Sequence, residues 1–245
     1  MHKNIPEISQ AIILAAGFGT RMQPLTFNTP KPLIKINDKP IIFYILEELR
    51  KNNIKHCFIN THYLSEKIEQ YIHTYKKKNS SMNIKIIKET EILETGGAIK
   101  NIKDKDSTKP IIVINGDSII IPNNSKNFLA DLIKNFDPNK MDFLLLLDNI
   151  KNSIGYSGKG DFISNSKTFP AKIFRKQANG LAYTGWQVLN PKIIDEVNVN
   201  KFSLNICYDK AIEDNLLWGI NNSGKWLHIG TKKALSEAIE WFKIN

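Results

Sequence analysis

Two glycines and two cations lie close together in the segment LAAGFGTRMQPLTFNTPKPL, residues 14–33. Gly17 and Gly19 directly follow a short apolar run, so the chain turns where backbone N–H groups can face an anion. Arg21 follows the turn, and Lys31 lies between two prolines that hold it in an extended, fixed path. A planar guanidinium and a compact ammonium above such donors suit a triphosphate under attack. The alternative is a surface loop with two incidental cations.

Two common phosphate-binding templates do not match this segment. A Walker A loop needs a glycine, four residues and then Gly-Lys-Ser/Thr, and that spacing does not occur here. A dinucleotide-binding fingerprint needs a third glycine where the chain has Met22. The segment therefore predicts a phosphate-binding loop of another kind.

A carboxylate that could hold a metal ion follows another apolar run. Asp117 comes shortly after residues 110–114 and directly after Gly116, at the carboxyl end of a predicted strand. Open α/β sheets bind ligands at that edge, and Mg²⁺ takes one or two carboxylates together with phosphate oxygens and water. The other interpretation is a simple turn, because Asn, Gly and Asp all favour turns.

Thr95, Gly96 and Gly97 open a predicted helix. Glycine destabilises a helix interior by about 1 kcal/mol relative to alanine. A flat base that packs against the bare backbone would give a reason for two glycines at this position. The alternative is an N-cap followed by a flexible first turn. His62 follows a strand end, and we expect it to make a structural hydrogen bond rather than to contact a ligand.

Short apolar runs and helical periodicities alternate along the first 150 residues. The runs of strand length are residues 11–15, 57–60, 84–87, 111–114 and 143–147, and the helical patterns cover 41–49, 64–75 and 126–136. Strand followed by helix, several times over, predicts a largely parallel sheet with helices on both faces.

The pattern changes after residue 150. Residues 150–169 are polar and contain glycines, so we expect a loop or hairpin there. Residues 182–189 predict a further strand, 203–217 a helix, and 232–242 a C-terminal helix. We therefore expect one α/β domain over residues 1–245.

The charge of +10 could indicate a polyanionic partner. However, Arg21, Arg50 and Arg175 are the only arginines among 34 basic residues, and the lysines are scattered over predicted solvent faces. Nucleic-acid surfaces cluster arginine, the better bidentate phosphate ligand. We therefore expect no nucleic-acid partner.

No segment predicts insertion into a membrane. The clean apolar runs, such as residues 143–147, are far shorter than the roughly 20 residues that a span needs, and residues 1–10 are mixed and polar. Cys57 and Cys207 lie on apolar segments without partners at metal-ligand spacing, as buried thiols in a reducing compartment do. The sequence thus predicts a cytoplasmic protein without a membrane partner.

Residues 14–33 resemble the signature of the sugar-1-phosphate nucleotidyltransferases, whose consensus runs Leu-Ala-Ala-Gly-x-Gly-Thr-Arg-Met/Leu-x-Pro-Leu-Thr before Pro-Lys-Pro. The resemblance continues in the family's order through INTHYL (59–64), ETGGAI (94–99), NGD (115–117), YTGWQVLNP (183–191) and WLHIGT (226–231). It implies a three-layer α/β/α sandwich with a mostly parallel, Rossmann-like mixed sheet, the nucleotidyltransferase fold. It also implies a nucleotide-binding half at about 8–120 and a sugar-binding half at about 121–245.

The resemblance assigns roles to individual positions. The catalytic residues it implies are Arg21, Lys31 and Asp117. The nucleotide-binding residues it implies are Leu14, Ala15, Ala16, Gly17, Gly19, Thr20, Arg21, Lys31, Asn60, Thr95, Gly96 and Gly97. The sugar-binding residues it implies are Asn149, Gly160, Thr184 and Gly185.

His228 departs from the family pattern. Relatives commonly have an aspartate at this position as the second metal ligand, beside the one that corresponds to Asp117. Imidazole is a poorer ligand for Mg²⁺ than for Mn²⁺ or Zn²⁺. Three explanations are open: His228 coordinates the metal, it contacts phosphate through water, or Asp117 and the substrate hold the metal alone.

The activity implied is transfer of a nucleotidyl group from a nucleoside triphosphate to a sugar 1-phosphate, with Mg²⁺ or alternatively Mn²⁺ as cofactor. The assembly expected is a monomer or a small homo-oligomer. ETGG, NGD and YTGWQVLNP look most like the N-acetylmuramate 1-phosphate uridylyltransferases, whereas thymidylyltransferases usually have Gln-Pro-x-Gly-Leu in place of ETGGAI. The alternatives are mannose- or heptose-1-phosphate guanylyltransferases, glucose-1-phosphate thymidylyltransferases, and a non-catalytic nucleotide-binding regulatory subunit of the same fold.

Overall fold

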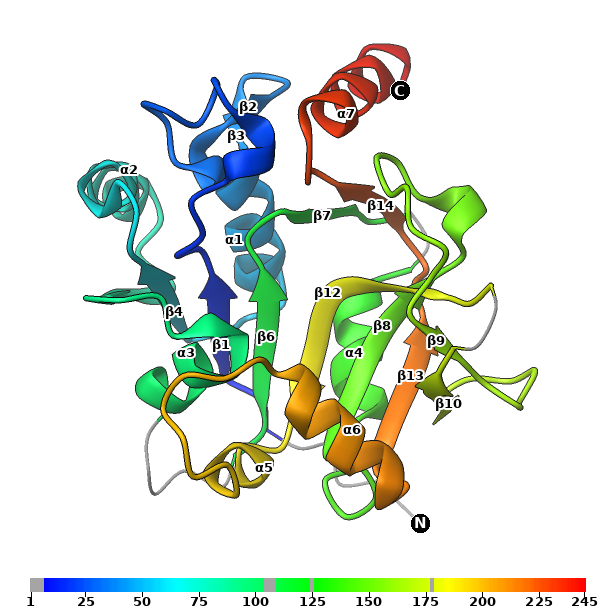
Figure 1. Cartoon of the computed structure of the whole chain (residues 1–245). Coiled ribbons are helices and arrows are strands. Elements are labelled where there is room, and N and C mark those ends of the chain that lie inside the picture. Colours follow the sequence, from blue (N-terminus) through cyan, green and yellow to red (C-terminus); the bar gives the residue numbers. More distant parts are fainter. Residues whose placement is uncertain (1–6, 104–108, 124–125, 177–178) are drawn as a thin grey trace.

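An eight-stranded sheet runs through the computed structural model, which describes residues 7–103, 109–123, 126–176 and 179–245 (Figure 1). In spatial order its strands are β10 (Ala171–Lys172), β13 (Leu217–Asn221), β8 (Phe143–Asp148), β12 (Ala182–Leu189), β6 (Ile111–Asn115), β1 (Gln10–Leu14), β4 (His56–Thr61) and β5 (Asn83–Lys88). The first six residues of the polar start of the chain lie outside the described residues.

Helices and short strand pairs complete the described part of the chain. The helices are α1 (Ile41–Lys51), α2 (Ser65–Lys78), α3 (Glu94–Ile102), α4 (Phe128–Asn135), α5 (Lys192–Asp195), α6 (Asn205–Glu213) and α7 (Lys232–Ile244), with short 3₁₀ turns η1 (Thr20–Met22), η2 (Lys31–Leu33) and η3 (Ile150–Asn152). The pairs are β2 (Lys35–Ile36) with β3 (Lys39–Pro40), β7 (Ser118–Ile121) with β14 (Lys225–His228), and β9 (Phe162–Ile163) with β11 (Phe174–Arg175).

The large sheet is mixed but mostly parallel, as predicted. β5, β4, β1 and β6 form one parallel block, and β8 and β13 are also parallel to each other. β12 lies antiparallel between β6 and β8, and β10 is an antiparallel edge. The carboxyl ends of β1, β4 and β6 therefore meet at one edge of the sheet, where open α/β folds bind ligands.

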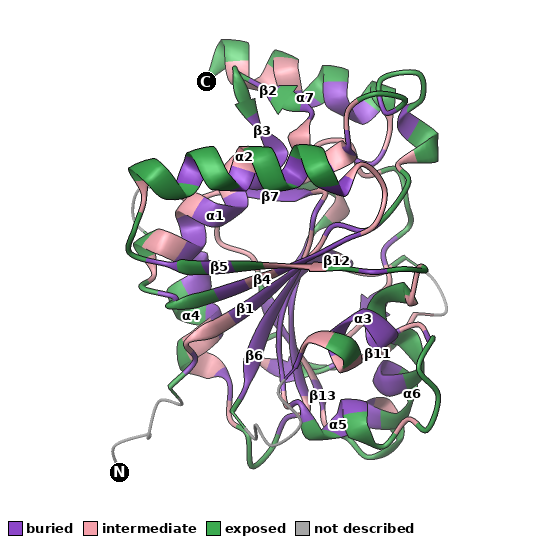
Figure 2. Cartoon of the chain, turned by 90° about the vertical axis from the view of Figure 1, so that its left-hand side faces the viewer, coloured by how far each residue is buried: buried purple, intermediate pink, exposed green. Residues whose placement is uncertain are grey.

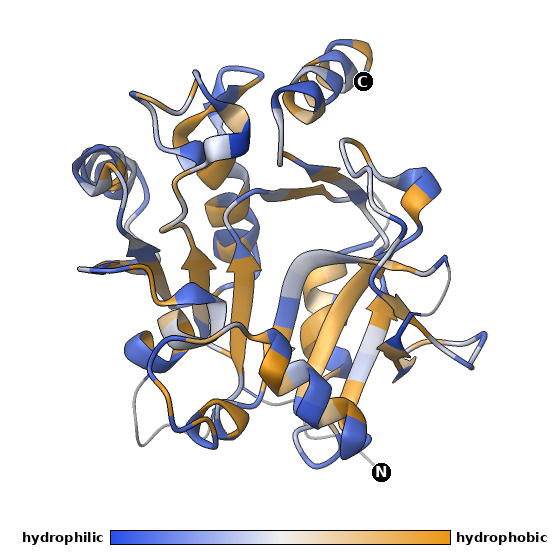
Figure 3. Ribbon diagram, in the orientation of Figure 1, coloured by the Kyte–Doolittle hydropathy of each residue, from blue (hydrophilic) through white to orange (hydrophobic). Residues whose placement is uncertain are grey.

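Alternating side chains bury both faces of the sheet. In β1, Ile13 packs into a core that includes residues of α1, α2, α4 and α7, whereas Ile12 packs into a second core with α3, α5 and α6. Successive strand residues point to opposite faces, so an isoleucine-rich strand without polar alternation must be covered on both sides. Figure 2 shows these strands buried between the helices, and Figure 3 shows the same strands as the most hydrophobic part of the ribbon.

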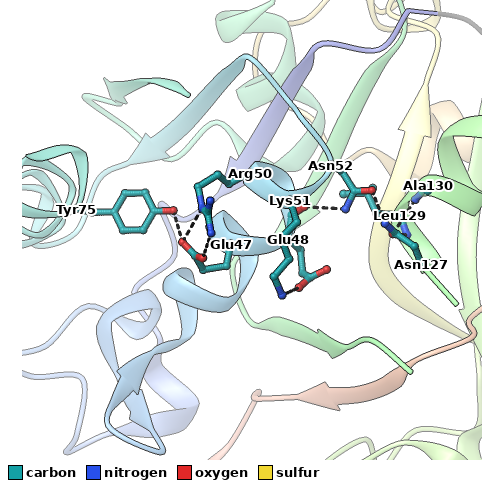
Figure 4. Close-up of polar contacts among 9 residues, drawn as sticks. All are labelled: Glu47, Glu48, Arg50, Lys51, Asn52, Tyr75, Asn127, Leu129 and Ala130. Carbon is teal, nitrogen blue, oxygen red and sulfur yellow. Dashed lines mark hydrogen bonds and ion pairs between the residues drawn. The ribbon is translucent and has the colours of Figure 1, made fainter. Parts of the chain in front are cut away.

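Helix α1 is tied to its neighbours by polar contacts (Figure 4). Glu47 accepts hydrogen bonds from Tyr75 of α2 at 2.7 Å and from Arg50 one turn later at 2.7 Å. At the end of the helix, the side chain of Asn127 donates to Asn52 at 2.8 Å, while its own oxygen caps the first N–H groups of α4. These contacts tie α1 to α2 and to the start of α4.

The predicted helix over 203–217 is wrong at its end. α6 stops at Glu213, and Leu217 begins strand β13. Asn215 has a φ of 61°, a left-handed conformation that ends helices. The apolar residues that follow continue the hydrophobic pattern, so periodicity alone did not separate the two elements.

Residues 150–169 form mainly a loop, as expected, with only η3 and β9 inside it. Across the described ranges, no helix is both long enough and apolar enough to cross a membrane.

Candidate active site

A cavity of about 370 Å³ opens at the carboxyl ends of β1, β4 and β6. β1 lies between the other two, so the strand order reverses here, and such switch points bind ligands in open α/β sheets. The lining residues are Leu14, Ala15, Ala16, Gly17, Gly19, Thr20, Arg21, Lys31, Pro32, Asn60, Glu89, Ile92, Glu94, Thr95, Asn115, Gly116, Asp117 and Gly230. The glycine loop, both predicted cations, Asn60, Thr95 and Asp117 are thus brought to one place.

The glycine loop is folded tightly after β1. Gly19 has a φ of 65°, a left-handed conformation that glycine adopts without a steric penalty. Its carbonyl accepts the N–H of Met22 and the hydroxyl of Thr26, both at 2.9 Å. Arg21 therefore stands in the short turn η1 and is exposed at the cavity.

Lys31 and Asp117 form an ion pair in the cavity. Nζ of Lys31 lies 2.5 Å from Oδ2 of Asp117, and both side chains are mostly buried. Burial by itself raises the pKa of the Asp117 carboxyl, but Lys31, followed by His228 and Arg21, outweighs burial and lowers that pKa below its ordinary value. Asp117 is therefore an anion at neutral pH, available to a cation.

A buried chain of hydrogen bonds supports the start of the glycine loop. The side-chain oxygen of Asn60 accepts the N–H of Ala15 at 2.7 Å, and its amide donates to Oε1 of Glu89 at 2.8 Å. Oε2 of Glu89 in turn accepts the N–H of Leu93 at 3.3 Å, just before α3. Asn60 lines the cavity as predicted, but its polar atoms are engaged by the protein, so its direct effect is to position Ala15.

The structure explains Gly96 and Gly97 by contacts within the protein, without the flat base that the sequence suggested. Neither glycine is among the described lining residues, and Phe202 and Asn200 occupy the space beside them. A methyl group on Gly96 would lie 2.2 Å from the ring of Phe202, and one on Gly97 would lie 2.2 Å from the carbonyl oxygen of Asn200. The missing side chains are required by contacts within the protein. Thr95 does line the cavity.

His228 lies behind the cavity wall instead of in it. Its ring contacts Trp226 and Tyr156, and its Nε2 lies against Gly230, which is the residue that faces the cavity. Burial lowers the pKa of His228, and this effect outweighs the opposite influence of Asp117. The imidazole is therefore mostly neutral at pH 7.

His62 makes the structural contact that was expected of it. Its Nδ1 lies 2.9 Å from the carbonyl oxygen of Glu89, which joins the ends of β4 and β5.

The donor set fits a cation that is held mainly by its substrate. Within the described ranges, no three His, Cys, Asp or Glu side chains are arranged to hold a metal ion. Asp117 offers one carboxylate at the cavity, and Mg²⁺ typically combines one or two carboxylates with phosphate oxygens and water. The site therefore fits Mg²⁺ bound together with a phosphate ligand.

The four predicted sugar-binding residues lie away from this cavity. The hydroxyl of Thr184 donates to the carbonyl of Leu146 at 2.8 Å, and the side chain of Asn149 caps η3. Gly160 packs against the backbone of Gly180, and Gly185 packs against the side chain of Asn115. Of these four, Gly185 thus touches a residue that lines the cavity.

Sequence reasoning missed several lining residues. Glu89, Ile92 and Glu94 form one wall, and Asn115 lies between the loop and Asp117. Glu89 directly follows β5, so a search for carboxylates at the carboxyl ends of strands would have found it as it found Asp117. Glu94 belongs to the ETGGAI motif but was given no role of its own, and Ile92 carried no comparable signal.

The chain matches the family model described as nucleotidyl transferase over residues 10–243. It is 30% identical over 225 residues to the N-acetylmuramate alpha-1-phosphate uridylyltransferase of Caulobacter vibrioides, which covers 91% of this chain and 93% of that protein. It is 28% identical over 242 residues to the mannose-1-phosphate guanylyltransferase catalytic subunit beta of Drosophila melanogaster, covering 92% of this chain but only 60% of that protein.

Solved structures share the fold. The UDP-glucose pyrophosphorylase from Acinetobacter baumannii superposes with a TM-score of 0.80 at 18% identity, covering 96% of this chain and 93% of that one. The likeness confirms the expected α/β/α arrangement around a mostly parallel sheet.

Proposed function

The chain belongs to the nucleotidyl transferase family, within the sugar-1-phosphate nucleotidyltransferases, and from this premise we propose that its substrates are UTP and N-acetylmuramate 1-phosphate. The observation that carries the reaction type is the meeting of Arg21, Lys31 and Asp117 with the glycine loop in one cavity. The choice of substrates is supported by the similarity to the Caulobacter uridylyltransferase over nearly the full length of both chains. Residues 94–97, Glu-Thr-Gly-Gly, support the same choice.

The charges in the cavity orient the nucleotide. Arg21 and Lys31 lie on the side formed by the glycine loop and η2, whereas Glu89 and Glu94 belong to the wall between β5 and α3. A triphosphate is attracted to the two cations and repelled by the two carboxylates. We therefore place the phosphates beside Arg21 and Lys31, and the nucleoside beside Glu94 and Thr95.

The reaction needs no covalent protein intermediate. An oxygen of the sugar 1-phosphate attacks the α-phosphorus, the bond from that phosphorus to the bridging oxygen breaks, and pyrophosphate leaves with the electron pair. Arg21 and Lys31 stabilise the negative charge that develops on the leaving group and on the α-phosphate. Positioning and charge neutralisation by these residues supply the catalysis.

Asp117 is the residue that would hold Mg²⁺. When bound, the ion neutralises phosphate charge and orients phosphate oxygens. Nζ of Lys31 donates to Oδ2 of Asp117 in this structure. In the complex with the nucleotide, we place this ammonium against the phosphates instead. His228 stays behind Gly230, where it contributes to the shape of the pocket wall rather than to coordination.

The acceptor approaches from the side of β12. Asp117 lies at the edge of the nucleotide cavity nearest to Asn115 and Gly185, at the point where the amino end of β12 meets the carboxyl end of β6. Because the side chains of Asn149 and Thr184 are used within the fold, we assign sugar contacts at Asn149, Gly160, Thr184 and Gly185 to backbone groups.

We also assign the protein to the cytoplasm, since Cys57 and Cys207 are free, buried thiols.

GTP with mannose 1-phosphate is the second candidate pair. It is supported by the similarity to the Drosophila guanylyltransferase subunit over 92% of this chain. The chain spans only 60% of that protein, whereas it spans 93% of the Caulobacter enzyme, and we therefore rank the uridylyl reaction first.

Pyrophosphate release over a grid of nucleoside triphosphates and sugar 1-phosphates tests the proposal. The expected result is the highest kcat/KM for UTP with N-acetylmuramate 1-phosphate. N-acetylglucosamine 1-phosphate, which lacks the lactyl group, is the matched control acceptor. A preference for GTP with mannose or heptose 1-phosphate would overturn the substrate assignment and leave the reaction type intact. No turnover in the whole grid, with nucleotide still bound, would instead favour a regulatory subunit.

A further inference from the structure

A segment from the second half of the chain forms part of the support for the nucleotide cavity. Residues 200–204 run between α5 and α6 and pass alongside the start of α3 (Figure 1). Phe202 is only 3% exposed and belongs to the core shared by α3, α5 and α6. The cavity is therefore supported by residues from both halves of the chain.

Three kinds of contact fasten this segment to α3. The carbonyl of Phe202 accepts the N–H groups of Gly96 at 2.9 Å and Gly97 at 3.1 Å, and its N–H donates to the carbonyl of Leu93 at 3.2 Å. The N–H of Leu204 donates to the hydroxyl oxygen of Thr95 at 2.9 Å. The ring of Phe202 fills the space in which a side chain at position 96 would stand.

The residues held in this way are those at the nucleoside end of the cavity. Ile92, Glu94 and Thr95 all line it, and each is within two residues of a hydrogen bond to the segment. Glu94 has a φ of 60°, which is unfavourable for a residue with a side chain and persists only where the surroundings impose it. The Phe202 carbonyl and the hydrogen bond between Leu204 and Thr95 supply that constraint on the carboxyl side of Glu94.

We propose that Phe202 is a positioning residue for the nucleoside triphosphate, which sets the distance between the Ile92–Thr95 wall and the glycine loop. It acts through Gly96 and Gly97 and does not itself touch the substrate, because it is buried behind α3. The proposal rests on the proposed function, since that function places the nucleoside beside Glu94 and Thr95. Loss of the ring moves the wall and weakens nucleotide binding more than it slows the chemical step.

A compensating pair of substitutions tests this coupling. Gly96→Ala forces a methyl group into the Phe202 ring, and overpacking of this kind shifts the backbone. Because such a shift displaces the Ile92–Thr95 wall, we expect it to weaken UTP binding about tenfold, a loss of about 1.4 kcal/mol. Phe202→Ala alone weakens binding through loss of the support. In the double variant Gly96→Ala/Phe202→Ala the clash is gone. The fold-increase in its UTP dissociation constant is therefore expected to be well below the product of the fold-increases in the two single variants.

The measurements separate positioning from simple loss of stability. They are the UTP dissociation constant by calorimetry, KM and kcat for each substrate, and the midpoint of thermal unfolding. Phe136→Ala is the matched control, because Phe136 is equally buried at the end of α4 but belongs to the core on the other face of the sheet from Phe202 and α3. We expect this variant to lose stability while binding UTP normally. Phe202→Leu is a milder second variant in case the alanine variant does not fold.

Two outcomes would overturn the proposal. One is a folded Phe202→Leu or Phe202→Ala variant that binds UTP within twofold of the unmodified protein; the other is strict additivity in the double variant. Neither result would affect the proposed function. Failure of the unmodified protein to bind any nucleoside triphosphate would overturn both, so the two failures can be distinguished.

Discussion

Lys31 and Asp117 form an ion pair in the cavity at the carboxyl ends of β1, β4 and β6, with Nζ 2.5 Å from Oδ2. The lysine comes from the stiff Pro-Lys-Pro segment and the aspartate from the turn after β6, 86 residues later. A cation that takes the position of the ammonium at that oxygen requires the pair to separate. In a complex with a triphosphate, the phosphates would then offer the ammonium a new partner.

The first prediction concerns Lys31. Lys31→Ala should lower kcat for pyrophosphate release about a hundredfold or more, because a donor aimed at developing phosphate charge is lost. Lys35→Ala is the control, since Lys35 is nearby, exposed and outside the lining of the cavity. Near-normal turnover by a stably folded Lys31→Ala variant would show that the lysine has no part in the chemistry.

The second prediction concerns Asp117. Asp117→Asn removes the carboxylate that the cavity offers to Mg²⁺, so stimulation of pyrophosphate release by Mg²⁺ should disappear over the whole concentration range. Rates are measured against Mg²⁺ and Mn²⁺ at saturating substrates. Normal Mg²⁺ stimulation in this variant would exclude Asp117 as the ligand.

The third prediction concerns Glu89. Its two carboxylate oxygens accept hydrogen bonds from the side-chain amide of Asn60 and from the N–H of Leu93. Glu89→Gln replaces one of these oxygens with an amide NH₂, which then faces one of the two donors. The expected loss of unfolding free energy is about 1–3 kcal/mol, the usual cost of an unsatisfied buried polar group, with a higher KM for the nucleotide.

Urea denaturation and steady-state kinetics measure the two effects of Glu89→Gln. The control is Glu91→Gln, which changes an exposed carboxylate in the same segment. Equal stability of the Glu89 and Glu91 variants would contradict the role of the buried chain.

The fourth prediction is a pH dependence that arises at Asp148. Burial raises the pKa of this carboxyl above its ordinary value, although hydrogen bonds from Asn222 and from the N–H of Asn149 partly offset the rise. The folded protein therefore holds the proton more tightly than the unfolded chain does. Its stability falls as the pH rises through the ordinary aspartate range, about 4, and the folded pKa above it.

Removing the charge should remove that loss. The change in unfolding free energy that Asp148→Asn causes, relative to the unmodified protein, is expected to be more stabilising at pH 7 than at pH 4. The unfolding free energies are measured in urea at both pH values. The exposed Asp131→Asn serves as the comparison. A difference from the unmodified protein that is the same at both pH values would show that Asp148 does not titrate differently in the two states.

Sequence reasoning identified the elements that position the site because their signals are local. Apolar runs and helical periodicity identified β1, β4, β5, β6, β8 and helices α1, α2 and α7, and the strand-end rule identified Asp117. The packing of Phe202 against Gly96 could not be inferred, because it joins segments about a hundred residues apart. The two glycines could be seen in the sequence, but the protein residues that pack against them, Phe202 and Asn200, could not.

The capping of α3 by Phe202 has a consequence for how the ligand's charge is balanced. The first N–H groups of a helix carry about half a positive charge and commonly bind phosphate. At the start of α3, the N–H groups of Gly96 and Gly97 donate to the carbonyl of Phe202. The N–H of Leu93, just before the helix, donates to the Glu89 carboxylate. These three N–H groups are therefore used within the protein. The proposed position of the phosphates at the opposite wall, beside Arg21, Lys31 and the turn after β1, does not depend on them.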